Sequence, residues 1–115
     1  MNTIQRGEVY EVKPDPSVGK EIQKSRPCVV VSSNVLNIES NLAVVCPATD
    51  AAGKTADVIH VLAKSGDGGL TKDSIILCDQ VKAVDQLRLT GKLGNLPAET
   101  MKKIDRGLRA VLNLT

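Results

Sequence analysis

Apolar residues along this chain fall mostly into short runs of aliphatic and β-branched side chains, separated by polar turn residues. Runs of this kind are typical of β-strands. They predict strands at 7–12, 28–33, 42–46, 57–62 and 74–77, and the alternating stretch 80–85 predicts a half-buried strand. Turn residues mark connections at 14–16, 66–69 and 91–95. Many short strands with closely spaced turns predict a small β-barrel or two packed sheets.

The last segment changes its period, because apolar residues recur there at helical spacing and charged residues cover the opposite face. The apolar face consists of Met101, Ile104, Leu108, Val111 and Leu112. Pro97 and Glu99 suit the first helical turn. The segment predicts an amphipathic helix that either packs on the strands or forms a dimer contact, so the fold class is mainly β with a C-terminal helix.

The 115 residues are enough for one domain with a buried core, expected to span residues 1–115. Aromatic residues are reduced to Tyr10, so the core must be built from Val, Ile, Leu and Ala. Proteins that bind single strands on stacking platforms use several aromatic rings. The composition therefore argues against that class of nucleic-acid binding.

The formal net charge is +2 and the sequence pI is near 8.5, below the value of roughly 9 that marks strongly basic nucleic-acid-binding domains. Local clustering is more informative than the total. Lys20, Lys24 and Arg26 lie in one short segment, with only Glu21 opposing them. Such a cluster is either a solvated loop or an anion-binding surface.

The three cysteines are widely spaced, lie in or beside apolar runs and form no CxxC pair, so buried reduced thiols are expected. The lone His60 has no partner at metal-ligand spacing, and neither a metal nor another cofactor is expected. The N-terminus lacks a signal-peptide apolar region, and no run approaches the roughly 18 residues of a membrane helix. We therefore expect a cytoplasmic protein without a membrane partner.

Arg26 and Thr49 stand at the ends of two predicted strands. Pro27 lacks a backbone donor and suits the first position of a strand. The residue before a proline is held extended, so Arg26 should project from a rigid point. If the strand that runs into Pro47 and Thr49 lies beside it, a guanidinium and a hydroxyl share one site. That pair suits phosphate chemistry.

Several enzyme classes lack their residues here: the chain has no GxxxxGK[ST] loop and no HExxH motif, and one histidine argues against a Ser-His-Asp triad. Metal-free RNA cleavage needs fewer protein groups, because the 2′-hydroxyl of RNA is itself the nucleophile and the protein need not supply one. Arg26 would stabilise charge at phosphorus and Thr49 would help position the sugar or phosphate. Arginine is a poor acid or base near neutrality, and Glu21 is the candidate base.

Several segments resemble, in order, the MazF/PemK family of toxin endoribonucleases. They are 6–10, 18–21, 24–31, 46–49, 73–80 and 84–89. The stretch Lys24-Ser25-Arg26-Pro27 running into valines is the most specific of them. Short motifs such as RPxxV are weak alone, but their order along nearly the whole chain makes the resemblance specific.

The resemblance implies an SH3-like small β-barrel of the CcdB/MazF type, assembled as a homodimer. It implies an mRNA interferase of a type II toxin–antitoxin system, which cleaves single-stranded RNA at short motifs without metal, leaves 2′,3′-cyclic phosphate and 5′-hydroxyl ends, and inhibits translation and growth. Arg26, Thr49 and Glu21 would be catalytic. RNA-binding roles are implied for Gly19, Lys20, Lys24, Ser25, Asn34, Lys54 and Gln80.

The expected partners are the RNA substrate and a cognate MazE-like antitoxin whose acidic, flexible tail occupies the RNA groove. Because Tyr10 is the only aromatic residue, base recognition would rely on polar groups and backbone.

Two alternatives remain open at this stage. A CcdB-like toxin of the same fold would poison DNA gyrase and would not depend on Arg26 and Thr49. A non-catalytic binding barrel would use Arg26 only in a structural ion pair with Glu21 or Asp50, since buried arginines are usually paired.

Overall fold

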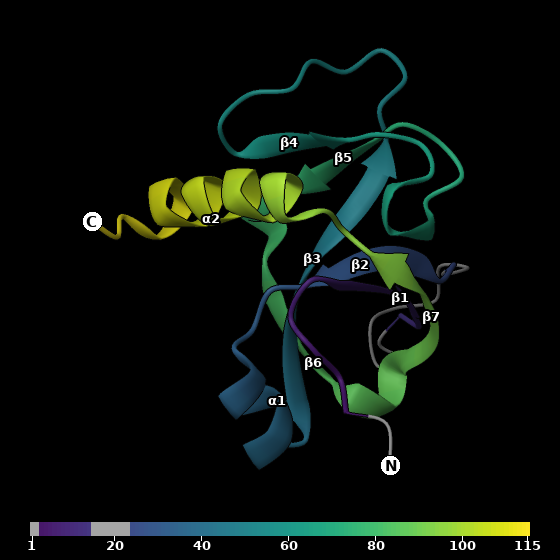
Figure 1. Ribbon diagram of the computed structural model, residues 1–115, viewed down its shortest axis with the longest axis vertical. Helices are drawn as coiled ribbons and strands as arrows, with labels where there is room; N and C mark the ends of the chain where they lie inside the picture. The colour runs from purple at the N-terminus through teal and green to yellow at the C-terminus, as the bar shows by residue number, and fades with distance from the viewer. Residues whose placement is uncertain (1–2, 15–23) are drawn as a thin grey trace.

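The computed structural model describes residues 3–14 and 24–115, and Figure 1 shows a curled sheet with a long helix lying against it. All strand pairs are antiparallel, in the order β4-β5-β3-β2-β1-β7, and β6 also pairs with β3. The strands are β1 (Glu8–Val12), β2 (Arg26–Val30), β3 (Leu42–Asp50), β4 (His60–Ala63), β5 (Ser74–Leu77), β6 (Lys82–Asp85) and β7 (Leu89–Asn95). The expected mainly β fold with a C-terminal helix is confirmed, with a curled sheet that approximates a barrel without closing.

The helical elements are short except for the last. They are α1 (Asn34–Glu39), the 3₁₀ turns η1 (Asp67–Gly69), η2 (Cys78–Gln80) and η3 (Gln86–Arg88), and α2 (Ala98–Leu112). None of the helices in the described part of the chain is long and apolar enough to cross a membrane. Ser33 caps α1, since its hydroxyl accepts a hydrogen bond from the Leu36 amide at 3.2 Å.

Each predicted strand corresponds to an observed one, but most of the boundaries differ. The strand predicted from residue 57 begins at His60, because the Asp57 carboxylate accepts hydrogen bonds from the Ile59 and His60 amides and forms a turn. The strand predicted from residue 80 begins at Lys82, after η2. The prediction of a turn at 91–95 was wrong, since β7 runs to Asn95 through pairing with β1.

Strand β3 is the centre of the sheet and is longer than predicted. Its first half pairs with β6, Val45 to Pro47 pair with β2, and Ala48 to Asp50 pair with β5. Pro47 therefore does not end the strand. It stands where β3 leaves β2 and takes β5 as its new partner, a position at which a missing amide donor is tolerated.

Side chains alternate between the two faces of the sheet and form two apolar clusters. One cluster holds Val29, Cys46 and Ile76 and is covered by α2 through Met101 and Ile104. The other lies inside the curl and includes the following residues: Val12, Cys28, Val30, Ala43, Val45 and Val84. Strand β2 contributes to both clusters, because Val29 faces one side of the sheet and Cys28 and Val30 face the other.

Helix α2 lies beside β4 (Figure 1) and also packs against η2. Of its predicted apolar face, Met101 and Ile104 are buried, whereas Leu112 is exposed near the end of the helix. Gly107 allows the close approach, because a Cβ there would lie 2.7 Å from the Cys78 sulfur and 2.8 Å from the Val58 carbonyl oxygen. The glycine that weakens the helix by sequence criteria is therefore required by its packing.

Candidate functional site

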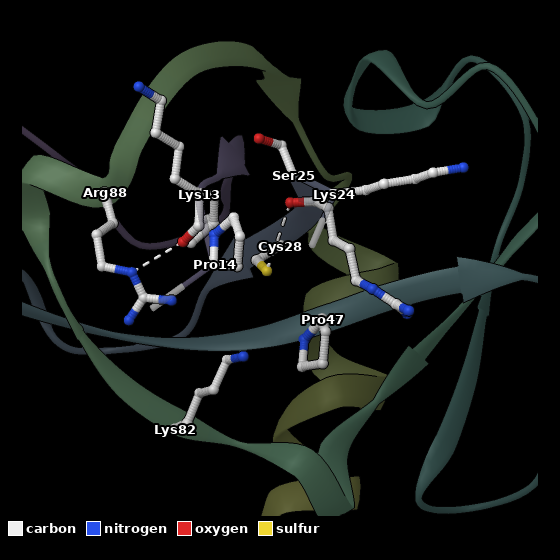
Figure 2. A pocket seen from close by; sticks show the side chains of 10 residues that line it. Lys13, Pro14, Lys24, Ser25, Cys28, Pro47, Lys82 and Arg88 are labelled. Carbon is white, nitrogen blue, oxygen red and sulfur yellow. Dashed lines mark hydrogen bonds between the residues drawn. The ribbon is translucent and has the colours of Figure 1, made fainter. Parts of the chain in front are cut away.

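A hollow of about 700 Å³ opens at the end of β2 where Arg26 begins the strand. Among the described residues its lining is entirely basic, neutral or apolar: Val12, Lys13, Pro14, Lys24, Ser25, Arg26, Cys28, Pro47, Lys82 and Arg88. We call it the basic hollow. Figure 2 shows Cys28 and Pro47 near its middle, with Arg88 and Lys82 to one side.

Its five basic residues come from separate parts of the chain. Lys13 follows β1, Lys24 and Arg26 lead into β2, Lys82 begins β6, and Arg88 ends η3. Their convergence follows from the sheet, because β1, β2 and β3 are neighbours and β6 pairs with β3 beside Val45. Like charges gathered in a concave surface raise the local potential and attract anions.

Backbone contacts fix two of these cations. The Arg88 Nε donates a hydrogen bond to the Lys13 carbonyl oxygen at 2.8 Å, and the Lys13 amide donates to the Arg88 carbonyl oxygen at 2.8 Å (Figure 2). This leaves the terminal nitrogens of the Arg88 guanidinium for other partners. The Cys28 thiol lies 3.7 Å from the Arg26 carbonyl oxygen and donates to it. Both contacts hold backbone at the wall of the hollow in place.

Cys28 is buried at 2% exposure on the floor of the basic hollow. Burial raises the pKa of its thiol to about 11 and the Glu11 carboxylate adds to the rise, although the nearby cations Lys82, Arg26 and Arg88 act to lower it. The group therefore keeps its proton at neutral pH. A protonated, buried thiol is a poor nucleophile, so the chemistry of the hollow rests on its cations.

Arg26 and Thr49 lie on neighbouring strands. The last β2–β3 pair joins Cys28 to Pro47, so Arg26 and Thr49 each stand two residues beyond the end of that pairing. Thr49 is half-buried and lines a second hollow of about 210 Å³, beside Pro27, Glu11 and Leu93. We call it the side hollow. The predicted pair thus stands at the junction between two hollows.

The other predicted site residues lie in different places. Lys24 and Ser25 line the basic hollow with Arg26. Asn34 begins α1 at the far end of β2, where its side-chain oxygen accepts from the Arg6 amide at 2.8 Å. Lys54 follows β3 and Gln80 ends η2, and neither lines either hollow. Gly19, Lys20 and Glu21 lie outside the described residues.

A structural ion pair between Arg26 and Asp50, one of the alternatives, is not formed. Asp50 pairs instead with Lys72, whose Nζ lies 3.5 Å from its carboxylate. Within residues 3–14 and 24–115, none of the five cations of the basic hollow forms an ion pair. Their charges therefore face solvent uncompensated by the described carboxylates.

Sequence reasoning missed Lys13, Lys82 and Arg88. No local motif marks them, since Lys82 sits in an ordinary alternating strand and Arg88 in a polar turn. The signal that could have found Lys82 is the register of β6, which places it opposite Val45, two residues from Pro47. That register depends on pairings between distant segments.

A sequence model describing the PemK-like, MazF-like toxin of type II toxin–antitoxin systems matches residues 5–112. The chain belongs to this family of toxins, and the basic hollow with both of its arginines lies within the matched region.

Particular relatives agree with that assignment. Endoribonuclease EndoA of Bacillus subtilis (strain 168) is 34% identical over 111 residues, which cover 96% of each chain. The fold matches the MazE-MazF crystal structure (Form-II) from Deinococcus radiodurans with a TM-score of 0.81 over 100% of both chains, at 21% identity. It also matches an endoribonuclease in complex with its cognate antitoxin from Mycobacterial species, with a TM-score of 0.77 over 97% of both chains, at 24% identity.

Proposed function

We propose that this chain is the toxin of a type II toxin–antitoxin system and acts as an endoribonuclease on single-stranded messenger RNA. The observation that carries the proposal is the basic hollow, with Arg26 on a rigid strand end and no carboxylate in its described lining. The relative EndoA is named as an endoribonuclease. Residues 1–115 would act as one toxin domain in the cytoplasm, where the messenger RNA is translated.

The chemistry follows from the groups present. The 2′-hydroxyl of the substrate attacks the adjacent phosphorus, the bond from phosphorus to the 5′ oxygen breaks, and the products are a 2′,3′-cyclic phosphate and a 5′-hydroxyl. Arg26 would hold the non-bridging phosphate oxygens through two parallel hydrogen bonds and stabilise the charge that develops on them. Thr49 would position the sugar or phosphate by its hydroxyl. We propose that this reaction needs no metal, because the cations of the hollow can supply the stabilising charge.

The attacking hydroxyl must lose a proton and the leaving oxygen must gain one. Arginine stays protonated near neutrality, so Arg26 is a charge stabiliser in this mechanism. Glu21 is our proposed base, with roles in RNA binding for its neighbours Gly19 and Lys20 and for Lys24 and Ser25. A base at residue 21 would give an acid limb in the pH–rate profile that Glu21→Gln removes.

The antitoxin would compete for the same cations. A flexible acidic tail can neutralise the basic hollow in place of RNA phosphates, since both are polyanions recognised by the same side chains. Solved neighbours of the same fold carry their antitoxins. We further propose a homodimer, which light scattering of the purified protein would test directly.

The direct experiment incubates the purified protein with a long single-stranded RNA in excess EDTA and maps the new 5′ ends. Discrete cuts bearing 5′-hydroxyls are expected for the wild type and not for Arg26→Ala. Arg106→Ala, which removes an exposed arginine side chain from α2, is the matched control and should cut normally. Absence of cleavage on several unrelated RNAs would contradict the proposal.

A further inference from the structure

The side hollow lies across strand β2 from the basic hollow and shares its strand ends. Along β2, Arg26 and Cys28 line the basic hollow, while Pro27 lines the side hollow. Along β3, Pro47 lines the basic hollow, whereas Ala48 and Thr49 line the side hollow. A phosphodiester held at Arg26 therefore has a second cavity within reach of its attached nucleoside.

Glu11 places a carboxylate in the side hollow. It lies on β1 directly opposite Pro27, on the face shared by Val9 and Val29, and it lines the hollow. Its backbone is fixed by pairing with β2 and β7, and its carbonyl oxygen accepts a hydrogen bond from the Thr90 hydroxyl at 3.2 Å. A side chain on a paired central strand is held more precisely than one on a loop.

The walls of the side hollow are suited to the flat faces of a base. Pro27, Leu70 and Leu93 present apolar surface, and the glycine at position 69 brings backbone close to Leu93. Tyr10, the only aromatic residue, lines a different cavity with Glu8 and Lys92, so it contributes nothing here. Aliphatic contacts must take the place of ring stacking.

Two further charged residues line the side hollow, Asp50 and Lys72, and they pair with each other at 3.5 Å. Glu11 forms no ion pair with a described residue. A carboxylate repels phosphate and accepts hydrogen bonds only, so Glu11 matches the side hollow to the donor edge of a base rather than to the RNA backbone. Adenine, cytosine and guanine carry exocyclic amino groups that can donate to it. Uracil presents a carbonyl oxygen on each side of its single N–H, and these oxygens face a carboxylate unfavourably.

We propose that the side hollow binds the base of a nucleotide adjacent to the scissile phosphate, and that Glu11 selects a base with an exocyclic amino group over uracil at that position. This inference rests on the proposed endoribonuclease activity and assigns a specificity residue to it. One well-placed side-chain contact to a base edge discriminates by about 1–3 kcal/mol, or roughly 5- to 150-fold.

The test compares cut sites of the wild type and Glu11→Gln on an RNA library in which the positions around each cut are fully randomised. For the wild type we expect uracil to be depleted at least about fivefold at one position next to the cut. The glutamine side chain has nearly the same shape and offers both a donor and an acceptor, so Glu11→Gln should accept uracil there at nearly the rate of the other bases. Glu39→Gln, the same chemical change on α1, should keep the wild-type preference.

Three outcomes overturn the inference while leaving the proposed nuclease intact: a wild type that accepts uracil on both sides of the cut, a variant with an unchanged preference, or a variant slowed equally at every sequence. The last result would identify Glu11 as a proton-transfer group. A wild type without any cleavage would instead refute the proposed function. Equal melting temperatures of the three proteins would show that the substitutions leave the fold unchanged.

Discussion

Two regions of this molecule differ in whether their basic side chains are paired with carboxylates. In the basic hollow, five cations converge and pair with none of the described carboxylates. Elsewhere on the sheet and helix, basic side chains form ion pairs with carboxylates. The Lys92 Nζ lies 2.7 Å from the Glu8 carboxylate, and Arg6 pairs with Asp105. His60 lies between two aspartates.

The difference separates stability from function. Removing one partner of a buried charge pair destabilises the folded state, whereas a group of like charges without partners itself opposes folding. Cations arranged at a cost to stability indicate a ligand that supplies the missing negative charge. If this interpretation is right, removing charge from the two regions should change different properties.

Arg26→Ala should have the largest effect. Losing the group that stabilises the phosphoryl charge should lower the cleavage rate about 10²- to 10³-fold, as for other removed charge-stabilising donors. Because Arg26 is exposed and unpaired among the described residues, unfolding free energy should change by no more than about 0.5 kcal/mol. Single-turnover cleavage and urea denaturation measure the two quantities. A loss of unfolding free energy as large as the loss of transition-state stabilisation would contradict the proposed difference between the two regions.

Glu8→Gln should show the reverse pattern. The Glu8 side chain is only 8% exposed, and it accepts hydrogen bonds from Lys92, from the Gln5 amide at 2.6 Å and from the Tyr10 hydroxyl at 3.0 Å. Removing its charge should cost about 1–3 kcal/mol of unfolding free energy, measured by urea denaturation. The cleavage rate of the folded variant should equal that of the wild type. Glu99→Gln, at the exposed first turn of α2, is the control and should cost far less.

Lys82→Ala should weaken RNA binding without stopping cleavage. Each phosphate neutralised on a single strand contributes about 0.7 to the slope of log affinity against log salt concentration. Loss of Lys82 should reduce that slope by about this amount, measured with a non-cleavable RNA analogue. Lys103→Ala on α2 keeps the slope of the wild type if the basic hollow is the binding site. Equal slopes for the wild type and Lys82→Ala would place the phosphates elsewhere.

His60 should produce the smallest effect, visible only in the pH dependence of stability. A hydrogen bond to Asp57 raises the pKa of His60, with partial burial opposing and Asp79 adding to the rise; its ring nitrogens lie 3.1 Å from the Asp57 carboxylate and 3.3 Å from the Asp79 carboxylate. Because the folded pKa is above the unfolded value of about 6.5, the contribution is full below that pH and lost as pH rises through the folded pKa. His60→Gln should therefore be less stable than the wild type in acid and equal to it in alkali. A constant difference across pH would show that the contact is not ionic.

The sequence predicted the elements with strong local patterns and missed those that depend on partners. Short apolar runs located five strands, one alternating stretch located a sixth, and helical spacing located α2. Strand β7 was missed because its two glycines give it little intrinsic β preference, and its pairing with β1 stabilises it. Helix α1 was missed because six residues containing valine and isoleucine carry little helical signal.

The part of the site formed by an arginine next to a proline was predictable from the sequence. The part formed by residues distant in the sequence was not. Arg26 was identified by the rigid strand end that Pro27 creates. Lys82 and Arg88 reach the same hollow only through the register of β6 on β3 and the hydrogen bonds between Arg88 and Lys13. Periodicity along one segment contains no information about such pairings.

The dispersed origin of the basic hollow has a consequence for how the chain is made. Arg26 leaves the ribosome early, but the hollow is incomplete until β6 and η3, which carry Lys82 and Arg88, have followed and paired. Pairing between distant strands is slow compared with local structure and cannot begin before both partners exist. On the function proposed above, the nascent chain should therefore be unable to cleave RNA through most of its own synthesis.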